Sequence, residues 1–424
     1  MIRAKEGVTV TSKERIVAAW NGSPADHVPL TVQAFGVPAH PAHRWERDGK
    51  PVNHWFSKRM EHIHTLPQPW SLEDDFARTQ ALLAIGIDDI IDVSVPWGTD
   101  PEVTFKDSLL PPTSTERHYV MVREYETPKG SLSHAVRKTE EGQNPGWVIQ
   151  PDYVPLIEDF NIPRAVRHIV EEPQDVEKLA YLYCVPGKAE ESWFRERMEK
   201  VKTFADSVSV PVQAWAAFGM DAVVWFCGTE KAVLLALDEP EAFGSLIDLV
   251  TEADEGRATL AASHPGVDMV VERGWYSSTD FWSPALFREF MVPHIRTIAA
   301  SVHRYGKKFA YVMTTGVEVL GPLLADCGVD VLYFVDPLDP IQKGLSLVKV
   351  RDLLSDRMTL VGGLSSLTLT TCDSVRIEGE VAHAMEVLAP TKRFILHPVD
   401  ALFPDTPWEG IEMMIESWKK RFSS

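Results

Sequence analysis

Lys308-Phe-Ala-Tyr-Val-Met-Thr-Thr-Gly316 is the stretch that decides the fold, because a short apolar strand here ends in polar residues and a glycine. A helix is predicted next, over Val317–Cys327, and a second apolar strand follows at 331–334. Short apolar strands that alternate with helices indicate a parallel sheet covered on both faces. In a barrel built this way, the functional residues lie at the carboxyl ends of the strands.

The same alternation continues over most of the chain from about residue 172. Further strands are predicted at 210–216, 267–272, 359–361 and 394–396, and two earlier ones at 28–32 and 86–95 bring the total to about eight. We therefore predict an α/β fold, a (β/α)8 TIM-type barrel, in preference to a doubly wound sheet. Residues 1–424 would form one decorated domain.

Two segments depart from the alternation, and an additional helix precedes it. Thr11-Ser-Lys-Glu14 is a capping box that predicts an N-terminal helix ending at Asn21-Gly22. Residues 36–74 are rich in His, Trp and Pro, and residues 100–170 contain a predicted β-hairpin with its turn at Thr127-Pro-Lys-Gly130. We expect both segments to be excursions over the barrel mouth.

Charge and cysteine content limit the classes of function. Lys and Arg total 42 and Asp and Glu total 61, which gives a net charge of −19. Such an acidic chain, with no basic run, argues against binding nucleic acid or an anionic membrane. The four cysteines are scattered, without a CxxC pair, which is typical of reduced thiols in the cytoplasm. No secretion signal or membrane-spanning run is expected from the sequence.

Polar residues at predicted strand ends are the candidates for chemistry. Glu272, Tyr311, His397 and Asp400 could serve as general acids, bases or hydrogen-bond donors. The structural alternatives are an ion pair for Glu272, barrel filling for Tyr311, and a packed ring and a turn cap for His397 and Asp400. Side chains that would contact a substrate are Gln33, Trp97, Trp225, Tyr276, Met313 and Asp336.

The stretch at 311–316, together with His397-Pro-Val-Asp400 and Pro404-Asp-Thr-Pro407, resembles the uroporphyrinogen decarboxylase and cobalamin-dependent methyltransferase superfamily, in its methyltransferase-like branch. In that family's metal-dependent methyltransferases, a His-x-Cys and a later Cys hold zinc. Tyr311, Met313 and Asp400 stand at those positions here. The resemblance therefore implies the same barrel without the thiolate zinc site.

Any metal would then need oxygen and nitrogen ligands, for which Glu272, His397 and Asp400 are the candidates. A His-x-His at His62 and His64 is a weaker candidate for a metal corner. Zinc stays open as a cofactor, and no metal is assigned from the sequence.

The resemblance implies a corrinoid-dependent methyltransferase, a demethylase component that moves a methyl group from a methoxylated aromatic molecule to a Co(I) corrinoid. The chain shows no Asp-x-His-x-x-Gly pattern, so the corrinoid would come from a separate protein partner. The alternatives are a decarboxylase or lyase acting on another small acid, and a barrel that binds a ligand without catalysis. A homodimer remains open.

Overall fold

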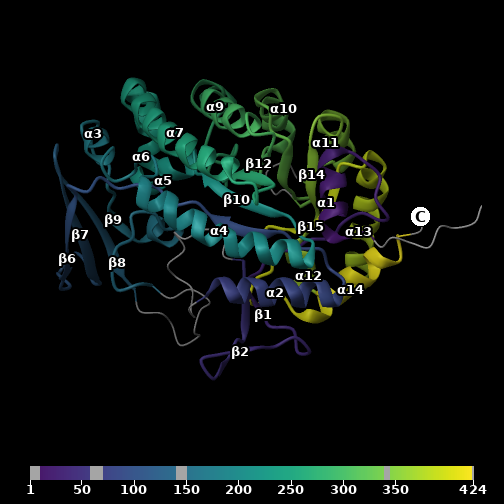
Figure 1. Cartoon of the computed structure of the whole chain (residues 1–424). Helices are drawn as coiled ribbons and strands as arrows, with labels where there is room; N and C mark the ends of the chain where they lie inside the picture. The colour runs from purple at the N-terminus through teal and green to yellow at the C-terminus, as the bar shows by residue number, and fades with distance from the viewer. Residues whose placement is uncertain (1–9, 58–69, 140–149, 339–343, 423–424) are drawn as a thin grey trace, which may run out of the picture.

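A curled parallel sheet forms the centre of the protein, in a computed structural model that describes residues 10–57, 70–139, 150–338 and 344–422. Its seven strands lie in the order β15-β14-β13-β12-β11-β10-β5 (Figure 1). Their bounds are β5 Ile91–Ser94, β10 Val212–Ala217, β11 Met269–Glu272, β12 Lys308–Val312, β13 Val331–Val335, β14 Thr359–Ser365 and β15 Phe394–Val399. Nearly all strand residues are buried, as expected when helices cover the outside of a parallel sheet.

Residues 29–34 close the sheet into a barrel. The amide of Thr31 donates to the Leu396 carbonyl, and the amide of Leu396 donates to the Pro29 carbonyl, so this segment runs parallel to β15. On its other side, the Leu30 carbonyl accepts from the amide of Asp88, just before β5. The predicted (β/α)8 TIM-type barrel is confirmed. The strand predicted at 28–32 is an extended segment with isolated bridges at Leu30 and Ala34.

The first helix forms where its capping signals predict. The Thr11 hydroxyl accepts from the Glu14 amide, the Glu14 carboxylate accepts from the Thr11 amide, and Gly22 ends the helix with a φ of 66°. Most of the other helices alternate with the strands and cover the barrel.

The α-helices of the described residues have the following bounds: α1 Ser12–Asn21, α2 Leu72–Ile85, α3 Asp175–Leu179, α4 Lys188–Val208, α5 Met220–Cys227, α6 Thr229–Asp238, α7 Pro240–Ser263, α8 Pro284–Leu286, α9 Val292–His303, α10 Val317–Cys327, α11 Leu347–Leu354, α12 Ser366–Thr370, α13 Ser374–Leu388 and α14 Trp408–Lys419.

Short helices of other types mark a few joints. The 3₁₀ turns are η1 Asp159–Arg164 and η3 Ala389–Thr391, and η2 Phe287–Met291 is a π-helical turn. The π-helical turn joins α8 to α9 without a break. Such turns insert an extra residue into a helix and often lie near functional groups.

An antiparallel sheet occupies one end of the molecule, beside α3 (Figure 1). It has the order β6-β7-β8-β9, with bounds β6 Thr104–Leu110, β7 Tyr119–Thr127, β8 Gly130–Lys138 and β9 Ala165–Arg167. The predicted hairpin is therefore present as β7 and β8, with a strand added on each side. Residues 35–56 add short strands, which are β1 Phe35–Pro38, β2 Glu46–Arg47, β3 Lys50–Pro51 and β4 His54–Phe56. That these segments extend over the barrel mouth stays a prediction.

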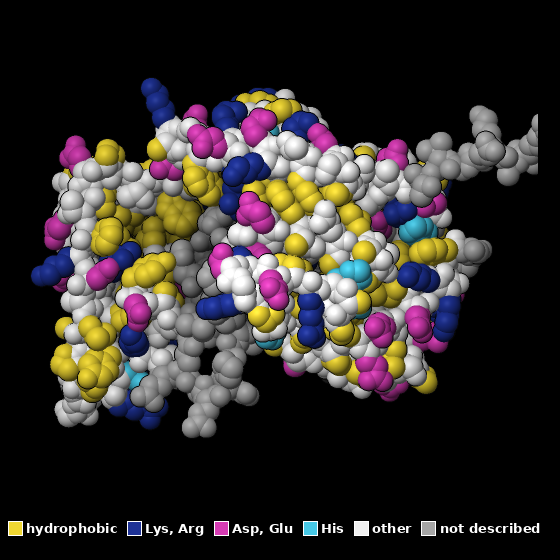
Figure 2. Space-filling view, turned by 60° about the horizontal axis from the view of Figure 1, so that its bottom comes forward, with side chains coloured by type: hydrophobic (Ala, Val, Ile, Leu, Met, Phe, Trp, Pro, Cys, Tyr) yellow, Lys and Arg dark blue, Asp and Glu magenta, His cyan; other side chains and the backbone are white. Residues whose placement is uncertain are grey.

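Charged side chains of both signs lie on the surface of the protein. Figure 2 shows acidic and basic side chains interspersed on the face in view, without one broad basic patch. In the described part of the chain, none of the helices combines the length and apolar character needed to cross a bilayer.

Candidate functional site in the barrel interior

A hydrogen-bonded network fixes which side of the sheet is the interior. The Tyr333 hydroxyl on β13 donates to Oε1 of Gln213 on β10, at 3.0 Å. These strands are not neighbours, so the two side chains meet across the barrel. Nε2 of Gln213 and Nε1 of Trp215 both donate to Oδ1 of Asp92, at 2.6 and 2.8 Å. The network is buried and joins three strands through the interior.

Aromatic rings extend from this network in a series that we call the interior ring series, made of Trp215, Trp275, Phe334 and His397. Trp215 stacks on Trp275 with ring centroids 5.8 Å apart, and Trp275 lies 6.0 Å from Phe334. Phe334 in turn stacks on His397 at 5.3 Å. The members come from the carboxyl ends of β10, β13 and β15 and from the loop after β11. Aromatic rings at this place in a barrel suit contact with a flat apolar molecule.

The His397 ring is held in place from one side. Its Nδ1 lies 2.9 Å from the Thr31 hydroxyl on the closing segment, and its side chain is 1% exposed. The Tyr333 ring meets it edge-on at 6.2 Å. His397 therefore points into the interior at the carboxyl end of β15, where the sequence predicted a functional histidine.

Arg273 lies at the edge of this interior, where its single positive charge faces two carboxyl groups. Its guanidinium contacts Asp221 at 2.5 Å and Asp159 at 2.9 Å. Trp225 and Trp275 cover the guanidinium, with centroids 4.6 and 4.7 Å from Cζ. Burial raises the pKa of Asp221 to about 6, even though Arg273 acts in the opposite direction. The positive charge of Arg273 is thus paired with carboxyl groups of the protein itself.

Two residues predicted to contact substrate belong to this arginine cluster. Nε1 of Trp225 donates to Oδ1 of Asp159 at 3.0 Å, and the Tyr276 hydroxyl donates to the same oxygen at 3.1 Å. Burial raises the pKa of the Tyr276 phenol, and the neighbouring Asp159 carboxylate adds to the effect. Both side chains thus hold Asp159, which the 3₁₀ turn η1, between β8 and β9, brings to the barrel.

Glu272 lies at the end of β11 but on the outer face of the sheet. Its Oε1 is 3.1 Å from Nε2 of His294 on α9, and neither side chain is exposed. Nδ1 of His294 lies 2.7 Å from the Thr251 hydroxyl on α7. Burial raises the pKa of Glu272. Burial also opposes the charged form of His294, but the Glu272 carboxylate outweighs it, so the pKa of His294 is raised as well.

Tyr311 shares the outer face with Glu272, because the two residues are paired in register between β11 and β12. Its hydroxyl lies 2.7 Å from the Ser277 hydroxyl. Burial raises the pKa of Tyr311 well above its usual value, and the Glu272 carboxylate adds to the effect. The structure thus brings Glu272 and Tyr311 together on one side of the sheet, and His397 faces the other side.

The remaining predicted residues lie at several places around the barrel end. Trp97 packs against Tyr183, at 5.9 Å between ring centroids, and Met313 is fully buried beyond β12. Asp336 accepts from the amide of Leu338, which is a turn contact. Asp400 directly follows β15, and Gln33 is buried on the closing segment.

The donor set does not fit the zinc site that the fold family implies. Within the described ranges, no three side chains of His, Cys, Asp or Glu gather as metal ligands would. The sheet separates Glu272 from His397, so the three predicted metal candidates do not converge. His62 and His64 lie outside the described residues.

Sequence reasoning missed several interior residues, namely Asp92, Gln213 and Tyr333, together with the outer partner His294. Asp92 and Tyr333 sit inside apolar strand runs, where the one available signal is a polar or phenolic group within an otherwise hydrophobic segment. His294 follows Pro293 in a long helix, and its proximity to Glu272 has no local sequence signal.

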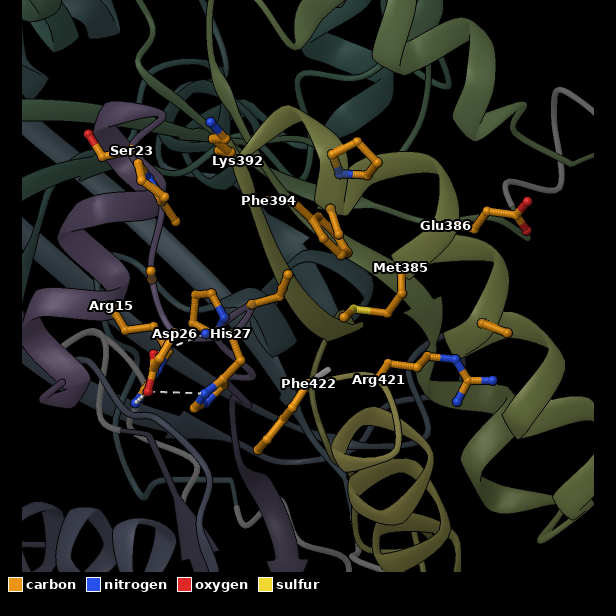
Figure 3. Close-up of a pocket in the computed structure, with 18 residues that line it drawn as sticks. Arg15, Ser23, Asp26, His27, Met385, Glu386, Lys392, Phe394, Arg421 and Phe422 are labelled. Carbon is orange, nitrogen blue, oxygen red and sulfur yellow. Dashed lines mark hydrogen bonds and ion pairs between the residues drawn. The ribbon is translucent and has the colours of Figure 1, made fainter. Parts of the chain in front are cut away.

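A separate cavity of about 680 Å³ lies at the opposite end of the barrel (Figure 3). It is lined by residues from α1, α13, the segments before the first and last barrel strands, the start of β15 and the residues after α14. Among them are His27, Met385, Lys392, Phe394 and Phe422. His27 stacks on Phe422 at 4.0 Å. Because barrel chemistry resides at the carboxyl ends of strands, we do not place the functional site in this cavity.

Comparisons with known proteins agree with the architecture. The family model for uroporphyrinogen decarboxylase (URO-D) matches residues 156–421. The methylcobamide:CoM methyltransferase MtaA of Methanosarcina barkeri is 26% identical over 191 residues, which cover 42% of this chain and 49% of that protein. The match thus spans about half the length of this curated relative.

A solved structure covers the chain more fully. A methyltransferase from Methanosarcina mazei aligns over 98% of this chain and 100% of its own length, with a TM-score of 0.56 and 16% sequence identity. At this identity the likeness supports the fold alone. Because the family model covers more than half of the sequence, the chain belongs to the uroporphyrinogen decarboxylase family.

Proposed function

We propose that this protein is a corrinoid-dependent methyltransferase that demethylates a methoxylated aromatic small molecule. The interior ring series carries the proposal, because it gathers aromatic rings inside the barrel, toward the strand ends where chemistry is expected. The likeness to a methylcobamide:CoM methyltransferase supports methyl transfer as the reaction type. A separate corrinoid protein would be the partner, and its Co(I) would be the methyl acceptor.

The reaction breaks the bond between the ether oxygen and the methyl carbon. The methyl group passes to Co(I), which supplies both electrons of the new bond, and the oxygen leaves with the electron pair of the broken bond. A proton must reach that oxygen, because an alkoxide or phenoxide is a poor leaving group. The products are the free alcohol or phenol and a methylated corrinoid.

His397 is the residue that we propose delivers this proton. Its ring lies in the interior, stacks on Phe334, and is oriented by the Thr31 hydroxyl. An imidazole can donate a proton near neutral pH, which suits a general acid. Asp400, which follows β15, is the proposed second group for exchanging the proton with solvent. The side chains of Glu272 and Tyr311 contact residues on the outer face of the sheet. The catalytic role predicted for them stays a prediction.

A Co(I) absorbance assay tests the proposal. Chemically reduced cobalamin, or a candidate corrinoid protein, is mixed with the enzyme and a panel of methoxylated aromatics. Loss of the Co(I) band and growth of methylcobalamin are expected for some members of the panel.

The His397→Gln variant should lose about 10²- to 10⁴-fold in rate, the usual contribution of a general acid. His303→Gln is the matched control, since His303 is on the helical surface and pairs with Asp330. No methyl transfer by the wild-type protein to any panel member would refute the proposed function.

A further inference from the structure

Gln33 lies on the inner face of the segment that closes the barrel. Thr31, two residues earlier, contacts the inward-facing His397 ring, and extended backbone returns to the same face every second residue. The Gln33 side chain is 4% exposed. Neither its amide oxygen nor its amide nitrogen has a hydrogen-bond partner.

Ser94 has the same condition on the neighbouring strand. It ends β5, two residues after the inward-facing Asp92, and is in register with Trp215. It is 4% exposed, and its hydroxyl also has no hydrogen-bond partner. Two buried polar side chains at the barrel end therefore remain unsatisfied, on adjacent segments and on the same face.

Such groups are rare because they are costly. A buried donor or acceptor that loses water and gains no partner destabilises the folded state. The nearby network does not relieve the cost, because Asp92, Gln213 and Tyr333 bond to one another and to Trp215. Unsatisfied polar groups on the inner face of a barrel end are the arrangement expected where a ligand supplies the missing partners.

We propose that Gln33 and Ser94 recognise a hydrogen-bonding substituent on the substrate ring. The substrate class is then an uncharged methoxylated aromatic that carries a hydroxyl or carbonyl group, as in 2-methoxyphenol. An amide and a hydroxyl can both donate and accept, so they pair with either group. A carboxylate substituent fits less well, because Arg273 is already balanced by Asp159 and Asp221. This inference rests on the proposed function for the methoxy group.

The test is a binding titration that needs no corrinoid. Quenching of tryptophan fluorescence, with Trp215 and Trp275 as interior reporters, is followed with 2-methoxyphenol and with methoxybenzene, which lacks the hydroxyl. The wild-type protein should bind 2-methoxyphenol roughly 10- to 100-fold more tightly than methoxybenzene. Methoxybenzene has no hydroxyl group and would leave the buried amide and hydroxyl of the protein without partners. In Gln33→Leu this ratio should fall close to one.

The melting temperature gives an independent readout. Gln33→Leu removes an unpaired buried amide and should raise the melting temperature, whereas a structural glutamine would lower it on substitution. Gln80→Leu, on the exposed side of α2, is the control. It leaves the barrel interior intact and should not change the binding ratio.

Equal binding of the two probes by the wild-type protein would overturn the inference. So would an unchanged ratio in Gln33→Leu, which would mean that bound water satisfies the amide. Failure of the proposed function is a different result. There, 2-methoxyphenol would bind selectively through Gln33, but no methyl group would reach Co(I).

Discussion

The buried pair of Glu272 and His294 should make the stability of this protein depend on pH in a way that one substitution removes. The Thr251 hydroxyl has a single proton, which it donates to the Ile247 carbonyl at 2.7 Å. It must therefore accept from Nδ1–H of His294, also at 2.7 Å. Nε2 of His294 then faces Glu272 with one proton to share between them, and the pair is neutral overall.

The direction of the pH effect follows from the raised pKa values of both groups. In the unfolded chain, the carboxyl group and the imidazole lose their protons at their ordinary pKa values of about 4.3 and 6.5. Above about pH 6.5 the folded pair still holds a proton that the unfolded chain has released. The free energy of unfolding should thus fall by about 1.4 kcal/mol per pH unit until the folded pair itself deprotonates.

Glu272→Gln should abolish this contribution. The amide matches the shape of a protonated carboxyl and can donate from Nε2 to the neutral His294 ring, so the fold is kept. The pair then has no proton to lose, and the slope of about 1.4 kcal/mol per pH unit should disappear. Glu272→Leu is the contrasting variant, because it leaves the buried Nε2 of His294 without a partner and should cost about 1–3 kcal/mol.

Urea unfolding of the wild type and Glu272→Gln, measured at intervals from pH 6 to 9, provides the assay. The difference in unfolding free energy between the two proteins should change with pH in the variant's favour. Parallel pH profiles would refute the reasoning, because they would mean that the wild-type pair exchanges no proton between the folded and unfolded states in this range.

Other buried groups give further expectations. Burial lowers the pKa of His134 to about 3, so the free energy of unfolding should fall by about 1.4 kcal/mol per pH unit as the pH drops below about 6.5. His134→Phe should therefore flatten the dependence of unfolding on acid between pH 6 and 4. An unchanged curve would contradict the assignment. Gly219→Ala should destabilise by at least about 1–2 kcal/mol in urea unfolding, because Gly219 has a φ of +49° and the added Cβ would lie 2.7 Å from Oε1 of Glu272. Gly379→Ala, in α13 with open space around it, is the matched control and should stabilise by about 0.5–1 kcal/mol; equal effects at the two glycines would exclude steric strain as the cause.

The barrel could be predicted because its signals are local. Apolar strands between helices recur along the chain, and helix α10 has the predicted bounds. Helix α5 was missed, since its residues Met220–Cys227 are almost all apolar and fully buried and so show no helical period. Strand β6 was missed for the opposite reason, because every residue of Thr104–Leu110 is exposed and the pattern lacks a buried face.

The candidate site could be predicted only in part, because a strand buried on both faces does not reveal which residues point inward. Glu272 and Tyr311 were grouped with His397 from their positions at strand ends. The register between strands decides the face, and it sets Glu272 against α9 and His397 against Tyr333. Gln33 was predicted to contact substrate from its place after the first strand, but its unpaired amide is a property of the folded interior alone.

Closure of the barrel by residues 29–34 has a consequence for how the chain folds during synthesis. Thr31 and His397 are 366 residues apart in sequence, and joining segments at that separation costs on the order of 5 kcal/mol in chain entropy. Until β15 has been synthesised and has left the ribosome, the closing segment lacks the strand that pairs with it. The sheet then has two open edges, one at the closing segment and one at β14. The growing chain is therefore exposed to pairing with other chains until its last strand arrives, and a truncation before residue 394 should leave a protein that aggregates.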